Sequence, residues 1–251
     1  MILAKVGVVK MPINDGDFIL VEYTGRVKET GEVFETTSEE VAKNEGLYRA
    51  GEVYEPRLIV VGEGWILKSV EEHLKKMDVG KTDKVEVPPE KAFGLRDPNK
   101  IRMVPLRRFS SNRIRPVPGM RVEFEGRLAT VRSVGAGRVQ LDFNPPLAGK
   151  TLVYEVTVKR KLTDKLDKIS ALIHRRIPTV DINKFKVNLK EKEVTVTIPD
   201  EAFYLEGLQL MKRGIATDIL RFFPEISTVK FIESFERSAP AEGEPSQEEK
   251  S

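Results

Sequence analysis

Residues 152–159 (LVYEVTVK) alternate between two sets of side chains, and this period of two belongs to a β-strand rather than a helix. Residues 17–27 (DFILVEYTGRV) repeat the pattern and place Ile19, Val21 and Tyr23 on one face. One face of each strand must therefore be buried. The strand predicted at 152–159 follows a Pro-Pro turn and an Ala-Gly corner that carries Leu147.

Shorter patterns surround these two strands. We expect strands at 33–37, 57–61 and 82–88, and a polar loop or flap over 38–56. The spacing of Ile66, Val70, Leu74 and Met77 predicts one face of an amphipathic helix. We expect this helix to end at Val79-Gly80, because glycine is common just after a helix.

The segment 95–140 differs from its surroundings. Prolines interrupt its first part, and three short strands separated by glycine turns are predicted within 119–143. Its net charge is +8, against −5 for residues 1–94, +3 for 141–235 and −3 for 236–251. Because charge blocks often follow domain edges, we expect a small, basic, all-β insert.

Residues 161–235 form a further predicted unit with the order αββαβ. Its first helix covers 163–176 with Thr163 as N-cap, and a second covers 200–223 with Asp200 as N-cap. Gly207 and Gly214 are weak points of the second helix. The acidic tail 236–251 is predicted to be disordered. The first ten residues are either a short strand or, because Met11 follows, a misassigned start.

Composition excludes several chemistries. Without cysteine, the chain has no disulfide framework, Cys-ligated metal or cysteine nucleophile, and its two histidines make a His-rich metal site improbable. We therefore expect no metal and no cofactor. No apolar run approaches the ~20 residues of a membrane span. We expect a soluble, cytoplasmic protein with no membrane partner, and the high charge also suits a heat-adapted organism.

Four separated motifs resemble the FKBP-type peptidyl-prolyl cis-trans isomerases in their order. They are VEYTGRVKETGEVFETT, VGEGWILKSVEEHLKKMDVG, VPPEKAFG and NPPLAGKTLVYEVTV. An insert between the last two is similar to the insert-in-flap domain of the SlyD-like branch, and the C-terminal unit has the layout of long archaeal forms. The resemblance implies an α+β fold in which a bent antiparallel sheet wraps around one short helix.

The resemblance also implies the division of the chain. Residues 1–94 and 141–160 would form the isomerase domain, 95–140 the inserted domain, 161–235 the C-terminal α+β domain and 236–251 the tail. The pocket that accelerates rotation about Xaa-Pro bonds would be lined by Tyr23, Phe34, Glu35, Ile66, Leu67, Val70, Phe93, Leu147 and Tyr154. Each of these residues taken singly also fits an ordinary core or surface position.

Two residues depart from the family pattern. Phe93 stands where the family often has a tyrosine, so one polar contact to a ligand is missing. Val70 replaces the tryptophan at the pocket floor. We expect activity to survive, because the chemistry rests on an apolar site, whereas binding of macrolide inhibitors is in doubt.

The insert supports two further hypotheses. By resemblance to SlyD-like proteins, it would hold unfolded, proline-containing polypeptides on an apolar surface formed by Met103, Val104, Leu106, Phe109, Ile114, Val117 and Met120. A chaperone without isomerase activity is the alternative. A third interpretation is RNA or ribosome contact through a basic run in the insert, which consists of Arg107, Arg108, Arg113, Arg115 and Arg121. A homodimer through the C-terminal domain is a hypothesis for that unit.

Overall fold

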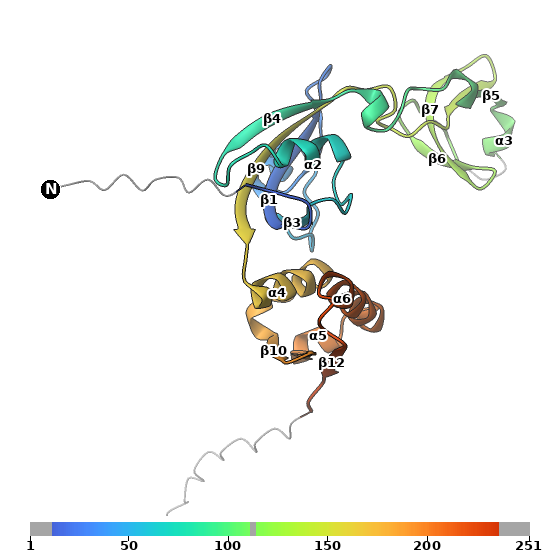
Figure 1. Cartoon of the computed structure of the whole chain (residues 1–251). Helices are drawn as coiled ribbons and strands as arrows, with labels where there is room; N and C mark the ends of the chain where they lie inside the picture. Colours follow the sequence, from blue (N-terminus) through green and yellow to red (C-terminus); the bar gives the residue numbers. More distant parts are fainter. Residues whose placement is uncertain (1–11, 111–113, 236–251) are drawn as a thin grey trace, which may run out of the picture. The chain divides into compact units, whose positions relative to one another are not determined.

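The computed structural model describes residues 12–110 and 114–235 (Figure 1). It divides the chain into two compact units between Thr163 and Asp164. The fold is α+β, with mostly antiparallel sheets and few helices, as predicted. The predictions for the first ten residues and for the tail 236–251 lie outside the described residues.

The first unit contains a five-stranded antiparallel sheet. Its strand order is β2-β1-β9-β4. Strand β3 pairs with residues 18–21 of β1, whereas β2 pairs with residues 24–26 of the same strand. The strands are β1 (Phe18–Val27), β2 (Val33–Thr36), β3 (Arg57–Val60), β4 (Thr82–Val87) and β9 (Leu152–Leu162). The alternating pattern of β1 and β9 reflects burial of one face of each strand, as expected. The side chains on these faces share one hydrophobic core: Ile19, Val21, Tyr154, Val156 and Val158.

One short helix packs against this sheet. Helix α2 (Lys68–Leu74) contacts β4 and β9 and buries Val70 and Leu74 completely. It is shorter than predicted, because Lys75 is already its C-cap; the chain continues in turns to Gly80. The predicted loop 38–56 contains a helix, α1 (Glu39–Asn44), capped by the Ser38 hydroxyl and held by the buried Ala42. The 3-10 turn η1 (Pro89–Lys91) follows β4.

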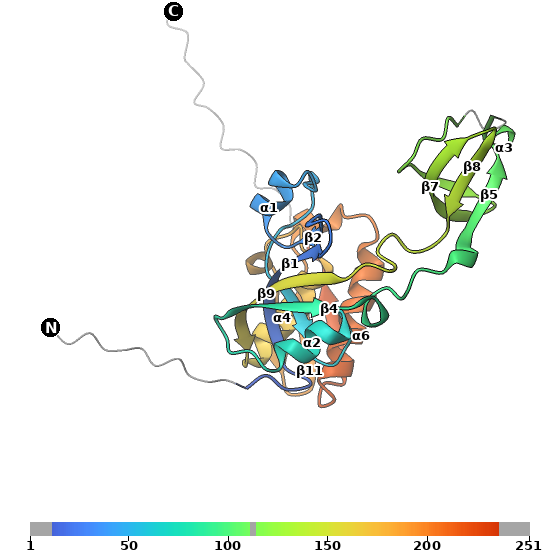
Figure 2. The ribbon, with the colours of Figure 1, turned by 90° about the horizontal axis from the view of Figure 1, so that it is seen from above.

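The insert has its own sheet of four antiparallel strands in the order β5-β8-β7-β6, and Figure 2 shows β5, β8 and β7 side by side. It is not all-β: helix α3 (Arg107–Ser110) lies within it, because the buried ring of Phe109 draws this turn onto the core. The turn η2 (Pro98–Lys100) and strand β5 lie in the Pro-interrupted stretch where no strand was predicted. The strands are β5 (Ile101–Pro105), β6 (Arg121–Phe124), β7 (Arg127–Gly135) and β8 (Arg138–Asp142).

A polar cluster ties the two segments that lead into and out of the insert. The side chain of Asn144 accepts from the Asp97 N–H at 2.9 Å and donates to the Asp97 carbonyl at 2.9 Å. Asp142 accepts from Asn144 and from Arg96. Burial raises the pKa of the Asp142 carboxyl, but these hydrogen bonds and cations outweigh it, so that the pKa lies below its usual value.

The second unit has a three-stranded sheet with two helices that contact each other and the sheet (Figure 1). Asp164, not Thr163, caps α4, accepting from Leu166 N–H at 2.8 Å and Asp167 N–H at 3.1 Å. Strand β12 pairs in parallel with β11. The elements are α4 (Lys165–Arg176), η3 (Ile182–Lys184), β10 (Lys186–Lys190), β11 (Glu193–Thr197), α5 (Asp200–Phe203), α6 (Leu208–Phe222) and β12 (Thr228–Ile232).

The predicted helix 200–223 is two helices. Gly207 adopts a left-handed conformation with φ 78° and separates α5 from α6, as an expected weak point. Asp200 is the first residue of α5 rather than its N-cap, which is Pro199. Gly214 does not interrupt α6. A Cβ at this position would lie 3.0 Å from the Arg176 guanidinium, which is bound to Asp218, so the absence of a side chain leaves room for this ion pair.

Candidate functional site

The centre of the candidate site is a group of three aromatic rings on neighbouring strands. Gly25 of β1 is paired with Glu35 of β2 on one side and with Tyr154 of β9 on the other. Because Gly25 has no Cβ, the ring of Phe34 fits over its Cα; a Cβ there would lie 2.5 Å from the end of the ring. Phe34 then meets Tyr154 edge-on, with 5.6 Å between ring centroids.

A hydrogen bond joins the aromatic group to the only carboxylate of the predicted site. The Tyr154 hydroxyl donates to Glu35 Oε1 at 2.5 Å. Burial, the negative charge of Glu35 and this hydrogen bond hold the pKa of Tyr154 well above its usual value. Burial, assisted by Glu35, also raises the pKa of Tyr23, whose ring centroid lies 6.1 Å from that of Tyr154. Both phenols therefore stay protonated at neutral pH.

The second wall is the loop that leads into α2. The carboxylate of Glu71, buried within α2, accepts from the Gly64 N–H at 3.1 Å, which holds this loop against the helix. Burial raises the pKa of the Glu71 carboxyl, opposed by the hydrogen bonds from the backbone of Gly64 and Gly62. Trp65, Ile66 and Leu67 follow directly and form the wall.

These two walls enclose an open cleft of about 430 Å³. Phe93, 42% exposed just after η1, completes its rim. Six of the nine predicted residues line the cleft, together with Gly64, Trp65 and Lys68: Tyr23, Glu35, Ile66, Leu67, Phe93 and Tyr154.

The other three predicted residues lie elsewhere. Val70 is fully buried in the core and lines neither this cleft nor the pocket beside it. Leu147 is half-buried and packs on the same core from the corner before β9. Phe34 lines the neighbouring pocket and touches the cleft through Tyr154.

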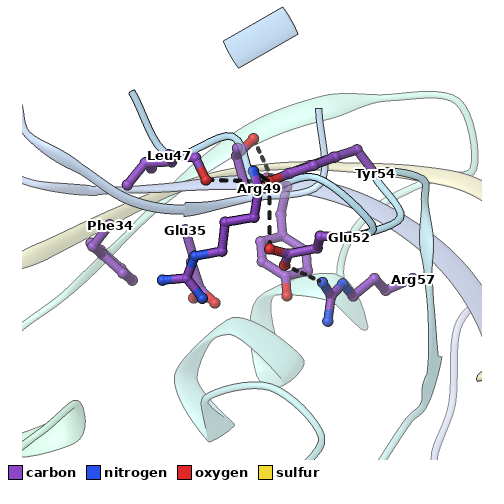
Figure 3. Close-up of a pocket in the computed structure, with 9 residues that line it drawn as sticks. Phe34, Glu35, Leu47, Arg49, Glu52, Tyr54 and Arg57 are labelled. Atoms are coloured by element: carbon purple, nitrogen blue, oxygen red, sulfur yellow. Dashed lines mark hydrogen bonds and ion pairs between the residues drawn. The ribbon is translucent and has the colours of Figure 1, made fainter. Parts of the chain in front are cut away.

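The neighbouring pocket, of about 240 Å³, shares Tyr23 and Glu35 with the cleft (Figure 3). Its remaining lining comes mainly from the predicted flap, with Leu47, Arg49, Glu52 and Tyr54. Strand β3 adds Arg57, and strand β2 adds Phe34 and Thr36. Sequence reasoning named Tyr23, Phe34 and Glu35 but missed the other residues of this pocket, which lie between Thr36 and Arg57. No periodicity marks them, because the conformation of an irregular loop decides which side chains turn inward.

Comparisons with known proteins identify the family. A short-type peptidyl-prolyl cis-trans isomerase of Methanocaldococcus jannaschii is 37% identical over 147 residues, which are 59% of this chain and 92% of the relative. An FKBP-type peptidyl-prolyl cis-trans isomerase SlyD of Treponema pallidum is 30% identical over 174 residues, 66% of this chain and 87% of the relative. A probable FKBP-type 16 kDa peptidyl-prolyl cis-trans isomerase of Pseudomonas fluorescens is 31% identical over 108 residues, 41% of this chain and 71% of the relative.

The chain belongs to the FKBP-type peptidyl-prolyl cis-trans isomerases. Two family models match further parts of this FKBP-type chain. One, described as "FKBP26, IF domain", covers residues 102–147, and the other, "FKBP26_C-terminal", covers residues 165–236.

The seven insert residues predicted to hold unfolded chains differ in their burial. Val104 and Phe109 are buried in the insert's own core, so they are not available to a client. Leu106 and Ile114 are half-buried against that core. Met103, Val117 and Met120 are exposed by 52%, 51% and 37%.

Across residues 12–110 and 114–235, no group of three His, Asp or Glu side chains could hold a metal ion. In the same part of the chain, no helix is long and apolar enough to cross a membrane.

Proposed function

We propose that this FKBP-type chain accelerates cis-trans isomerisation of Xaa-Pro bonds in folding polypeptides, and that the reaction takes place in the cleft between β1, β9 and the loop before α2. The observation that supports this most strongly is the junction of an aromatic wall and an aliphatic wall at one open cleft. Its volume of about 430 Å³ is within the usual range for ligand sites.

The chemistry follows from the properties of the amide bond. An Xaa-Pro bond prefers trans by only ~0.5–1 kcal/mol, but the barrier to rotation is ~18–20 kcal/mol. In the twisted transition state, amide resonance is lost and the carbonyl is less polarised. A water-poor cleft therefore binds the twisted form better than the planar form, and each 1.36 kcal/mol gained in this way is about tenfold in rate.

The walls divide this task between them. Ile66, Leu67 and the ring of Phe93 would exclude water from the proline. The Tyr154 hydroxyl is already bound to Glu35, so Tyr154 presents its ring rather than a donor. In the described part of the chain the Tyr23 hydroxyl makes no hydrogen bond, and its raised pKa keeps it protonated. We assign Tyr23 as the donor that orients the carbonyl before proline.

The test is exchange spectroscopy by NMR on a short Leu-Pro peptide. Ile66→Ala and Phe93→Ala remove cleft surface from half-buried or exposed positions, so both variants should stay folded. Each is expected to lower kcat/KM by about 5- to 30-fold, because each removes apolar area worth ~1–2 kcal/mol. Leu210→Ala, 74% exposed in the second unit, is the matched control. Unchanged catalysis in both cleft variants would contradict the assignment.

We further propose that the insert acts as a holdase for unfolded chains. Met103, Val117 and Met120 support this, because three large apolar side chains stand exposed on a domain that has its own separate core. Replacing all three with Ser should weaken suppression of aggregation of a denatured client while leaving isomerisation of the short peptide unchanged. Equal suppression by the variant would contradict the proposal. The matches to residues 102–147 and 165–236 support the division into isomerase, inserted and C-terminal domains.

A further inference from the structure

The pocket beside the cleft is unusual in holding two arginines next to a site built for apolar chemistry. Figure 3 shows the Arg49 side chain directed toward Glu35, and Arg57 facing Glu52. The pocket shares Tyr23 and Glu35 with the cleft, so a polypeptide whose proline fills the cleft has a neighbouring residue at the mouth of this pocket.

The anions of the pocket already have partners. Glu35 accepts from the Tyr154 hydroxyl at 2.5 Å. Glu52 accepts from the Tyr54 hydroxyl at 3.5 Å and faces Arg57 at 3.6 Å, which is a long ion pair. Tyr54 in turn binds the backbone of residues 47 and 49, fixing the loop that carries Arg49.

The guanidinium groups of Arg49 and Arg57 have N–H donors that are not used in hydrogen bonds within the described residues. A guanidinium carries five N–H groups. Within the described residues, the Arg49 side chain makes no hydrogen bond or ion pair, and Arg57 makes only its contact with Glu52. The two side chains together therefore offer several unused donors to one acceptor, and the geometry of a carboxylate matches that of a guanidinium group.

Size and direction favour a single substrate side chain. The pocket's volume of about 240 Å³ equals that of roughly eight liquid water molecules at ~30 Å³ each, which admits the side chain of Glu but not a run of backbone. Tyr23 lines both spaces and would orient the carbonyl before proline, so the residue that carries this carbonyl lies nearest to the pocket.

We propose that Arg49 and Arg57 form a subsite that selects substrates with an acidic residue immediately before proline. This proposal rests on the proposed function of the cleft. Because the arginines are partly exposed and Glu35 and Glu52 oppose a third carboxylate, we expect a modest selectivity: about three- to tenfold in kcat/KM for Glu-Pro over Gln-Pro. The preference should shrink at high salt, because solvent-exposed charges are screened.

The experiment compares Glu-Pro, Gln-Pro and Leu-Pro versions of one short peptide by exchange NMR, using the full chain. Arg49→Gln and Arg57→Gln should each bring the Glu-to-Gln ratio toward one, and Arg49→Glu should bring it below one. Arg160→Gln, which removes an exposed cation from β9, should leave the ratio unchanged. Glu-Pro and Gln-Pro rates that are equal in the wild type, or a ratio that survives in both arginine variants, would overturn the proposal.

Failure of the subsite is distinguishable from failure of the proposed function. Turnover of the Leu-Pro peptide without a Glu preference contradicts the subsite alone. If the wild type binds these peptides but isomerises none of them, the isomerase proposal is contradicted. The subsite is then tested by the ratio of Kd for the Glu and Gln peptides, followed through the fluorescence of Trp65, which lines the cleft. A preference for Glu after proline instead of before it would also overturn the assignment.

Discussion

Gly25→Ala is the substitution that tests the geometry of the aromatic wall most specifically. The added Cβ would lie 2.5 Å from Phe34 Cζ, with two further ring atoms at 2.9 and 3.1 Å. Since carbon atoms in contact are separated by ~3.5–4.0 Å, the ring must retreat by roughly 1 Å. This displacement breaks the edge-on contact with Tyr154.

The displacement should cost activity more than stability. Forcing one methyl group into a packed site typically costs ~1–3 kcal/mol of folding free energy, whereas misplacing groups around a reacting bond by ~1 Å can cost about 10²-fold in rate. We therefore expect a 10- to 100-fold loss in kcat/KM for a Leu-Pro peptide in a variant that stays folded. Exchange NMR measures the rate, and denaturant unfolding measures the stability.

Two controls separate this reasoning from a general effect of alanine. Gly135→Ala adds the same methyl group to strand β7, where nothing lies within 4 Å, and should change neither quantity. In a Phe34→Leu background the obstructing end of the ring is gone, so Gly25→Ala should add little to the loss. Activity of Gly25→Ala within twofold of wild type would refute the account of the wall.

Three further predictions concern stability. Tyr154→Phe removes the hydroxyl that binds Glu35 and should lower the free energy of unfolding by about 1–2 kcal/mol in urea. Asp142→Asn should cost about 1–3 kcal/mol at pH 7 because it uncouples Arg96. Since the pKa of Asp142 is lowered on folding, this deficit should disappear as the pH falls through that lowered value, below 3.8. Gly214→Ala, normally favourable in a helix, should destabilise the second unit because its Cβ meets Arg176 at 3.0 Å.

Each of these has its own check. Tyr204→Phe, 90% exposed, should be neutral where Tyr154→Phe is not. A deficit of Asp142→Asn that is the same at pH 7 and pH 3 would contradict the role of the carboxylate. A gain in stability for Gly214→Ala, measured by thermal unfolding, would show that Arg176 moves aside at no cost.

Patterns in the sequence predicted what depends on periodic burial. The alternation in 17–27 and 152–159 placed Tyr23 and Tyr154 on their strands, and the spacing of Val70 and Leu74 predicted the buried face of α2. Helix ends were predicted less well, because a single residue decides them: Asp164 caps α4 with two hydrogen bonds where Thr163 was expected.

The remaining features depend on contacts between residues distant in sequence. That the ring of Phe34 occupies the space above Gly25 follows from the register of β1 and β2, which alternation alone does not determine. Helix α1 has only six residues and one buried side chain, too few for a periodic signal. Arg49 lies in an irregular loop and Arg57 begins β3, so spacing in the sequence could not predict that both line one pocket.

The central claim is that this cleft accelerates rotation about the Xaa-Pro bond without proton transfer. The most direct measurement is the cis-trans exchange rate of a Leu-Pro peptide with the wild-type chain from pH 6 to pH 9. The account predicts catalysis that is flat across this range, because the raised pKa values of Tyr23 and Tyr154 keep both phenols protonated throughout it. A rate that follows a titration within the range, or no catalysis by the folded chain, would contradict it.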